Sequence, residues 1–146
     1  MSSLIAAPAA PQSPENTVVA ADGWYPEIDC NETRAVLRLG DIVPHERLVS
    51  AILGALIHVM GELRAWRSAQ EAAGAQGLAA VAPLDEVNGQ SRLCLLFTRA
   101  VVYTAGVQLA ETHRDVTATK EGEARREATW AIRDILGVTR TAVELI

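Results

Sequence analysis

Residues 92–102 read RLCLLFTRAVV, a run in which apolar side chains fill almost every position around Arg92 and Arg99. A helix with this pattern is apolar nearly all round its surface, so other parts of the fold must cover it on most sides. Either Asn88 or Ser91 can cap its N-terminus, and we expect the helix to reach about Asp115. The sequence therefore predicts one central, most buried helix around which the remaining elements pack.

A second long helix is predicted upstream of this run, from Pro44 at its first position to about Ala73. Its apolar residues recur at spacings of three and four, which is typical of a core-facing stripe: Leu48, Ile52, Leu56, Val59, Leu63 and Trp66. A second stripe, Leu53, Ile57 and Met60, lies beside the first. A small monomeric bundle needs only one such face, so the excess predicts a neighbour, either within the fold or in another subunit. Gly54 and Gly61 are interpreted as points of close packing.

Two shorter helices flank these elements. Asp29, followed by Glu32, fits a capping box in its aspartate form and opens a helix over residues 30–39 that Gly40 ends. A last helix is expected over residues 121–136, with Gly137 as its stop. The core-facing side chains of that helix are Ala124, Ala128, Ala131, Ile132 and Ile135.

The segments between the helices show no strand pattern. Residues 74–83 are rich in Gly and Ala and predict a loop with at most a turn of helix. Asn88-Gly89 marks a turn, but it does not lie between two alternating runs, so no β-hairpin is expected. The predicted fold is all-α, a small bundle of about four helices, one of them long.

The ends of the chain differ in composition from the middle. Residues 1–23 are rich in Ala, Pro, Ser and Gln, a composition that buries too little apolar surface to offset backbone ordering, and we expect a flexible or partner-ordered arm. Residues 24–140 form the expected helical domain. Residues 141–146 carry β-branched side chains and no helix cap, which predicts an extended tail.

Charge and composition exclude several classes of protein. The 146-residue chain has a net charge of −5 and no Lys/Arg stripe, so we do not expect it to grip phosphate backbones. Cys30 and Cys94 match no metal or redox spacing. The uncharged stretch over residues 48–61 is shorter than the roughly 20 residues that span a bilayer, and residues 1–14 lack the basic region of a secretory signal. We expect neither a membrane anchor nor a leader.

Catalytic, metal-binding and cofactor motifs are not visible. His45, His58 and His113 stand near no nucleophile elbow, glycine-rich phosphate loop or His-Glu-x-x-His pattern. The acid pairs Asp85/Glu86 and Glu111/Asp115 lie next to turns or helix ends, where solvated carboxylates are ordinary. We therefore expect no enzyme, no metal and no cofactor.

Two non-enzymatic classes remain open from the residues alone. One is a structural subunit that buries its excess apolar surface against copies of itself. The other is a cytoplasmic helical binding module or transcriptional regulator. Residues 121–133 carry Arg125, Arg126 and Arg133, as a recognition helix would, but Glu121, Glu123 and Glu127 cancel their attraction for DNA.

Six strings of residues favour the first class by their order and spacing along residues 24–146. They are WYPEID (24–29), VPHERL (43–48), GELRAWR (61–67), DEVNGQS (85–91), RAV (99–101) and WAIR (130–133). In this order they resemble the head completion (gpL-type) proteins of temperate contractile-tailed bacteriophages. No single string is specific by itself.

The resemblance implies a head-to-tail adaptor with no reaction to catalyse. Such a subunit is made in the host cytoplasm and joins a homo-oligomeric ring of about twelve copies under the portal protein after DNA packaging. The ring retains the genome, and its place in the virion is the head-tail junction. Its partners are the portal, the tail terminator or tail-completion protein, and the genomic double-stranded DNA, which passes through the lumen without sequence-specific binding.

Two sets of residues are candidate contact sites under this hypothesis. The expected subunit interface consists of Leu53, Ile57, Met60, Trp66, Trp24 and Tyr25. The expected portal-docking tail consists of Ala142, Val143, Glu144, Leu145 and Ile146, which suit a strand or hook that orders on a partner.

Overall fold

The fold is known from a computed structural model of the chain, which describes residues 13–40, 42–112 and 118–137. Six helices and four short strands lie in these residues. The helices are α1 (Cys30–Leu37), α2 (His45–Glu62), α3 (Arg64–Ala72), α4 (Leu78–Val81), α5 (Arg92–Thr112) and α6 (Ala118–Leu136). The strands are β1 (Val18–Val19), β2 (Ile28–Asp29), β3 (Glu86–Val87) and β4 (Gln90–Ser91).

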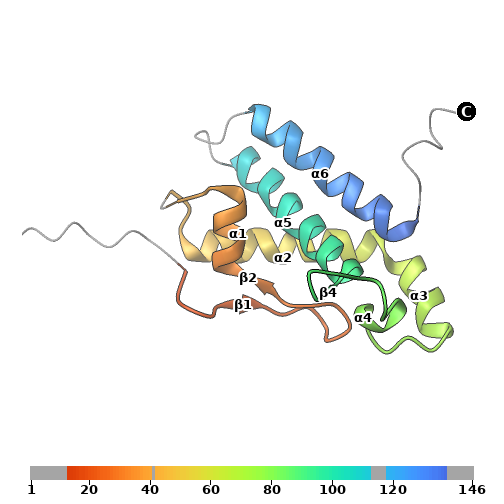
Figure 1. The fold of residues 1–146 in the computed structure, drawn as a ribbon. Coiled ribbons are helices and arrows are strands. Elements are labelled where there is room, and N and C mark those ends of the chain that lie inside the picture. Colours follow the sequence, from red (N-terminus) through yellow and green to blue (C-terminus); the bar gives the residue numbers. More distant parts are fainter. Residues whose placement is uncertain (1–12, 41, 113–117, 138–146) are drawn as a thin grey trace, which may run out of the picture.

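Helix α5 is the centre of the fold, which confirms the prediction from residues 92–102. It packs along α6 on one side and across α2 on the other (Figure 1). Phe97, Ala100, Val101 and Ala105 on α5 are fully buried. By length and composition α5 could cross a membrane, as could α2 and α3 if the bent pair were one span, but half of α5's most apolar window is buried inside the fold. Such burial is typical of a core helix.

The predicted helix from Pro44 to Ala73 is in fact two helices. Helix α2 ends at Glu62, and α3 leaves it at an angle of 61°. Leu63, at the junction, is fully buried with φ −92° and ψ 0°, and it keeps both flanking helical hydrogen bonds. The bend carries Trp66 to within 6.3 Å of Trp24, measured between ring centroids. The apolar periodicity continues through Leu63, so the sequence pattern does not show the bend or the contact between Trp24 and Trp66 that accompanies it.

The ordered domain begins upstream of residue 24. Strand β1 pairs antiparallel with β2, with Val18 opposite Asp29 and Val19 opposite Ile28. Ser13 is buried, and its Oγ accepts a hydrogen bond from Arg34 Nε at 3.0 Å. Residues 13–23 therefore belong to the folded domain rather than to the expected arm, because pairing and side-chain bonds compensate for their polar composition. Residues 1–12 lie outside the described residues.

The turn at Asn88-Gly89 closes a hairpin, contrary to the sequence-based expectation. Strands β3 and β4 pair through Glu86 with Ser91 and Val87 with Gln90. Asn88 and Gly89 have φ of +54° and +73°, as the two central residues of a type I′ turn require. The strands are only two residues long, so no alternating run precedes or follows the turn. With the β1–β2 pair, the fold is thus mostly helical rather than strictly all-α.

The remaining boundaries differ by a few residues from those predicted. The carboxylate of Asp29 caps α1 by accepting the Glu32 amide at 2.8 Å, but α1 ends at Leu37, where Arg38 takes a left-handed conformation, rather than at Gly40. Helix α6 begins at Ala118, and its predicted apolar face is buried. Gly137 follows α6 with φ +72°, which fits its predicted role as a stop.

Candidate functional site

The titratable side chains of the described residues are scattered rather than clustered. No group of three or more His, Cys, Asp and Glu side chains gathers among them. Cys30 is fully buried, and burial raises the pKa of its thiol, which disfavours the reactive thiolate. His45 Nδ1 lies 2.9 Å from Ser13 Oγ, whereas His58 is exposed on α2. The functional surfaces must therefore be sought in shape, apolarity and charge.

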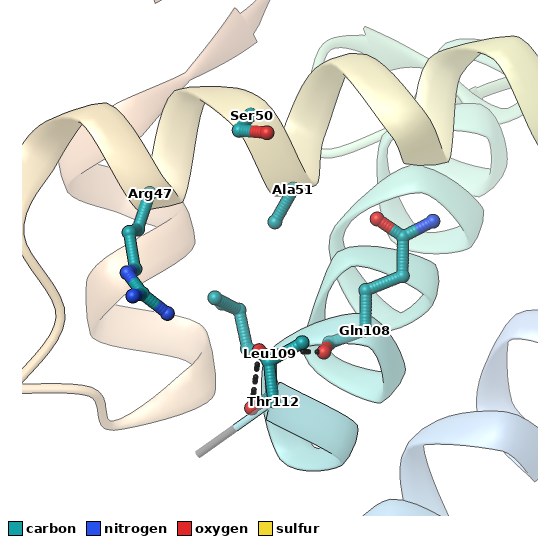
Figure 2. Close-up of a pocket in the computed structure, with 6 residues that line it drawn as sticks. All are labelled: Arg47, Ser50, Ala51, Gln108, Leu109 and Thr112. Carbon is teal, nitrogen blue, oxygen red and sulfur yellow. Dashed lines mark hydrogen bonds between the residues drawn. The ribbon is translucent and has the colours of Figure 1, made fainter.

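A shallow pocket of about 260 Å³ opens between α2 and α5 (Figure 2). Six residues line it: Arg47, Ser50, Ala51, Gln108, Leu109 and Thr112. The Thr112 hydroxyl is directed back to its own helix, where it donates to the carbonyl oxygens of Gln108 and Leu109 at 3.0 and 3.3 Å. The lining has no carboxylate or imidazole to serve as a base, so the pocket has no acid–base pair.

The four α2 and α3 residues of the expected subunit interface reach the surface to different degrees. Leu53 and Ile57 are 46% and 76% exposed on the outer side of α2, and Met60 and Trp66 are half-buried. Between Arg47 and Glu62 the helix has no Asp, Glu, Lys or Arg. An exposed helix face of this length without charge is typical of a contact surface rather than of a solvated one.

Trp24 and Tyr25 do not belong to that surface. They are only 7% and 4% exposed, because both rings pack into the chain's own core. The Trp24 ring meets Tyr25 edge-on at 4.8 Å between centroids, and the Tyr25 ring stacks on Phe97 at 4.4 Å. Neither ring is therefore exposed for a neighbouring subunit as expected, although Tyr25 also lines the groove at the bend between α2 and α3. Large aromatic residues beside a proline give the same sequence signal in a core as at an interface.

The bend between α2 and α3 creates an open groove of about 380 Å³, which we call the elbow groove. It is lined by Tyr25, Ile57, Met60, Gly61, Arg64, Arg67, Ser68 and Glu71. It could not be predicted from the sequence, because it exists only where the long helix bends.

Charges in and beside the elbow groove are only partly paired. Arg67 forms ion pairs with Asp22 and with Glu71, the latter at 2.9 Å. Burial works to raise the pKa of Asp22, but hydrogen bonds from Arg67 and the Trp24 amide, with the Arg67 charge, outweigh it and lower that pKa. None of the ion pairs between described residues involves Arg64, which is exposed at the groove wall.

A second exposed apolar surface lies on the β3–β4 hairpin. Leu84, just before β3, is 96% exposed, and Val87 in β3 is also exposed. The base of the hairpin is fixed by Arg92, whose Nε lies 2.6 Å from Asp85 Oδ2 and whose amide donates to the Asp85 carbonyl. Glu86 is exposed and takes part in no ion pair between described residues. In the sequence, this surface corresponds to two apolar residues, Leu84 and Val87, on either side of two acidic residues.

The expected portal-docking residues, 142–146, lie outside the described residues, so their geometry adds nothing to the site.

Comparison with known proteins gives two matches. The sequence model of the family described as phage head completion protein (GPL) matches residues 19–146. A head completion/stabilization protein of Escherichia phage P2 is 31% identical over 169 residues, which cover 100% of this chain and 99% of the relative. No solved structure matches the chain significantly.

Proposed function

The chain belongs to the phage head completion protein (GPL) family, and from that premise we propose that it is a head-to-tail adaptor subunit. In this function about twelve copies join a ring under the portal once the DNA is packaged. The ring retains the genome at the head-tail junction and offers a platform to the tail terminator or tail-completion protein. The subunit is made in the host cytoplasm, and no reaction is required of it.

The single observation that carries this proposal is the uncharged outer face of α2. Ile57 is 76% exposed there, and nothing in the described part of the chain covers it. Burial of an apolar side chain of this size is worth about 1.5–3 kcal/mol, so a neighbour that covers this face is favoured. A ring supplies one such neighbour for every copy.

The charge of the chain supports the proposal at the DNA channel. A chain of net charge −5 gives a ring of about twelve copies a charge of roughly −60, so DNA in the lumen meets net repulsion rather than a surface that holds it. This suits a channel through which the genome must slide without sequence-specific binding.

We further propose that residues 142–146 dock on the portal, since Val143, Leu145 and Ile146 give this segment apolar side chains without a helix cap.

The proposal is tested in heads that lack this chain but contain the portal. Addition of the purified chain is expected to protect the packaged DNA from nuclease, and the chain should co-sediment with the heads. The variant Ile57→Asp is expected to lose both effects, whereas Val36→Asp, at another exposed apolar residue, on α1, should keep them. A chain that stays in the soluble fraction would contradict the adaptor function and favour a cytoplasmic binding module or regulator.

A further inference from the structure

Two surfaces of the chain each combine an exposed apolar part with a charge that joins no ion pair between described residues, and the two charges are opposite. The elbow groove has an exposed apolar wall and, in Arg64, a cation that joins no ion pair between described residues. The β3–β4 hairpin carries, in Glu86, a carboxylate that joins no ion pair between described residues, and Leu84 protrudes from the turn just before β3. The cation of the groove can therefore pair with the carboxylate of the hairpin, and the apolar wall of the groove can cover the leucine.

The groove is built to receive a protruding side chain. Ile57 and Met60 form an apolar wall, and a methyl group built on Gly61 would meet no atom within 4 Å, so the space beside this wall is open. Tyr25 supplies a firm floor, because its ring is stacked on the buried Phe97. Arg67 is already engaged with Asp22 and Glu71, which leaves Arg64 as the cation available to a ligand.

The hairpin is built to be inserted. Leu84 is 96% exposed, so its own chain contributes almost nothing to covering it. The I′ turn at one end and the Asp85–Arg92 ion pair at the other hold the short strands in place. A pre-ordered segment loses little conformational entropy when it docks, which favours binding.

We propose that the β3–β4 hairpin of one copy docks in the elbow groove of the next copy. Leu84 packs against Ile57 and Met60, and the Glu86 carboxylate pairs with the Arg64 guanidinium. This inference rests on the proposed ring and specifies its subunit contact. Because the two surfaces differ, the contact is head-to-tail, and its repetition closes a ring when the rotation between copies allows it.

Disulfide trapping tests the contact in the full chain, with Cys94→Ala as background because Cys94 is partly exposed. The two variants Leu84→Cys and Ser68→Cys are mixed and oxidised, both free at high concentration and bound to portal rings. We expect mixed disulfide dimers at a yield several-fold above that of Leu84→Cys mixed with Thr129→Cys, another exposed hydroxyl residue, on α6. A yield no higher than this control in both arms overturns the inference, even if the chain binds the portal normally.

Charge reversal provides the second test. Arg64→Glu and Glu86→Arg should each reduce the trapping yield several-fold, and the chain that carries both changes should recover it, since the ion pair is then rebuilt in reverse. Circular dichroism checks that every variant keeps its helices. Loss without recovery in the double variant overturns the assigned pair. Failure of the unmodified chain to bind portal rings would instead contradict the adaptor function, so the two failures are distinguishable.

Discussion

The Tyr25 ring lies almost parallel to the Phe97 ring, with 10° between the planes and 4.4 Å between the centroids. Phe97, on the central helix α5, is the largest fully buried side chain among the described residues, and Tyr25 forms the floor of the elbow groove. The groove is therefore supported directly by the centre of the core. A change in the floor is therefore also a change in the core, so its effect on stability has to be measured apart from its effect on docking.

The hydroxyl of Tyr25 is buried, and no hydrogen bond of good geometry reaches it in the described part of the chain, although the Arg67 guanidinium lies beside the ring. Because an unpaired buried polar group costs free energy, Tyr25→Phe should leave the free energy of unfolding unchanged or raise it by about 1 kcal/mol. Tyr25→Ala removes the stacked ring and should lower it by roughly 3–5 kcal/mol. Urea unfolding followed by tryptophan fluorescence measures both. A clear loss of stability in Tyr25→Phe would mean that the hydroxyl is paired.

Periodic burial made the central part of this fold predictable. Residues 92–102 carry charge only at Arg92 and Arg99, so α5 was expected to be central, and the apolar faces of α2 and α6 followed the helical repeat. The bend at Leu63 was not predictable, because the residues on both sides fit a helix and the contact that accompanies the bend involves Trp24, some forty residues earlier. The hairpin was missed because two-residue strands leave no pattern.

The candidate site was predictable only where it follows the helical repeat. Leu53 and Ile57 formed a second stripe that the fold leaves exposed, as an interface would require. The elbow groove and the hairpin depend on tertiary geometry, so no local signal placed Arg64 or Leu84 in a site. Trp24 and Tyr25 were assigned to the surface because composition alone cannot tell a core aromatic from an interfacial one.

Two helical glycines should respond oppositely to a methyl group. A Cβ on Gly54 would lie 2.7 Å from Gln108 Oε1, the end of a flexible, half-buried side chain that can turn away. Gly54→Ala should therefore raise the free energy of unfolding by up to about 1 kcal/mol through helix propensity. A Cβ on Gly106 would lie 2.8 Å from Leu37 Cδ2 and 3.7 Å from Ala124 Cβ, between two packed helices. Gly106→Ala should lower the free energy of unfolding by about 1–3 kcal/mol through overpacking.

Urea denaturation of both glycine variants and the wild type checks this pair, each serving as the other's control for general effects of Gly→Ala. A shift of the same sign in both would contradict the packing argument.

The ion pair between Asp22 and Arg67 should make stability depend on acid. The pKa of Asp22 lies below its usual 3.8 in the folded chain, so the contribution of its carboxylate is present above that value and is lost as the pH falls through the folded-state pKa. The free energy of unfolding of Asp22→Asn should therefore fall below that of wild type at neutral pH. The difference should shrink below about pH 4. Urea titrations of both chains at several pH values measure it, and a difference that stays constant into acid would rule out this linkage.

The acidic balance of the chain predicts weak contact with DNA. With a net charge of −5 and several arginines already held in ion pairs, the purified chain should not bind duplex DNA even at low salt, where electrostatic attraction is strongest. Fluorescence anisotropy of a labelled duplex at low and moderate salt tests this. Tight binding that weakens steeply with salt would contradict the proposed passive lumen and indicate a basic surface formed on assembly.

A variant in the turn of the hairpin distinguishes an effect on folding from an effect on docking. Gly89 has φ +73°, and a Cβ in the left-handed region costs roughly 1–2 kcal/mol, so Gly89→Ala should distort the turn or destabilise the chain by about that amount. Because β3 and β4 contribute almost no buried side chains, most of the helical core should remain, and circular dichroism should change little. The disulfide-trapping yield should nevertheless fall several-fold, since Leu84 and Glu86 then lose their fixed positions.

Gly74→Ala is the matched control, because Gly74 also has positive φ, +100°, but lies outside the hairpin and the elbow groove. If both variants trap equally well, the hairpin does not need its rigid turn to dock, and pre-ordering is not the source of its affinity.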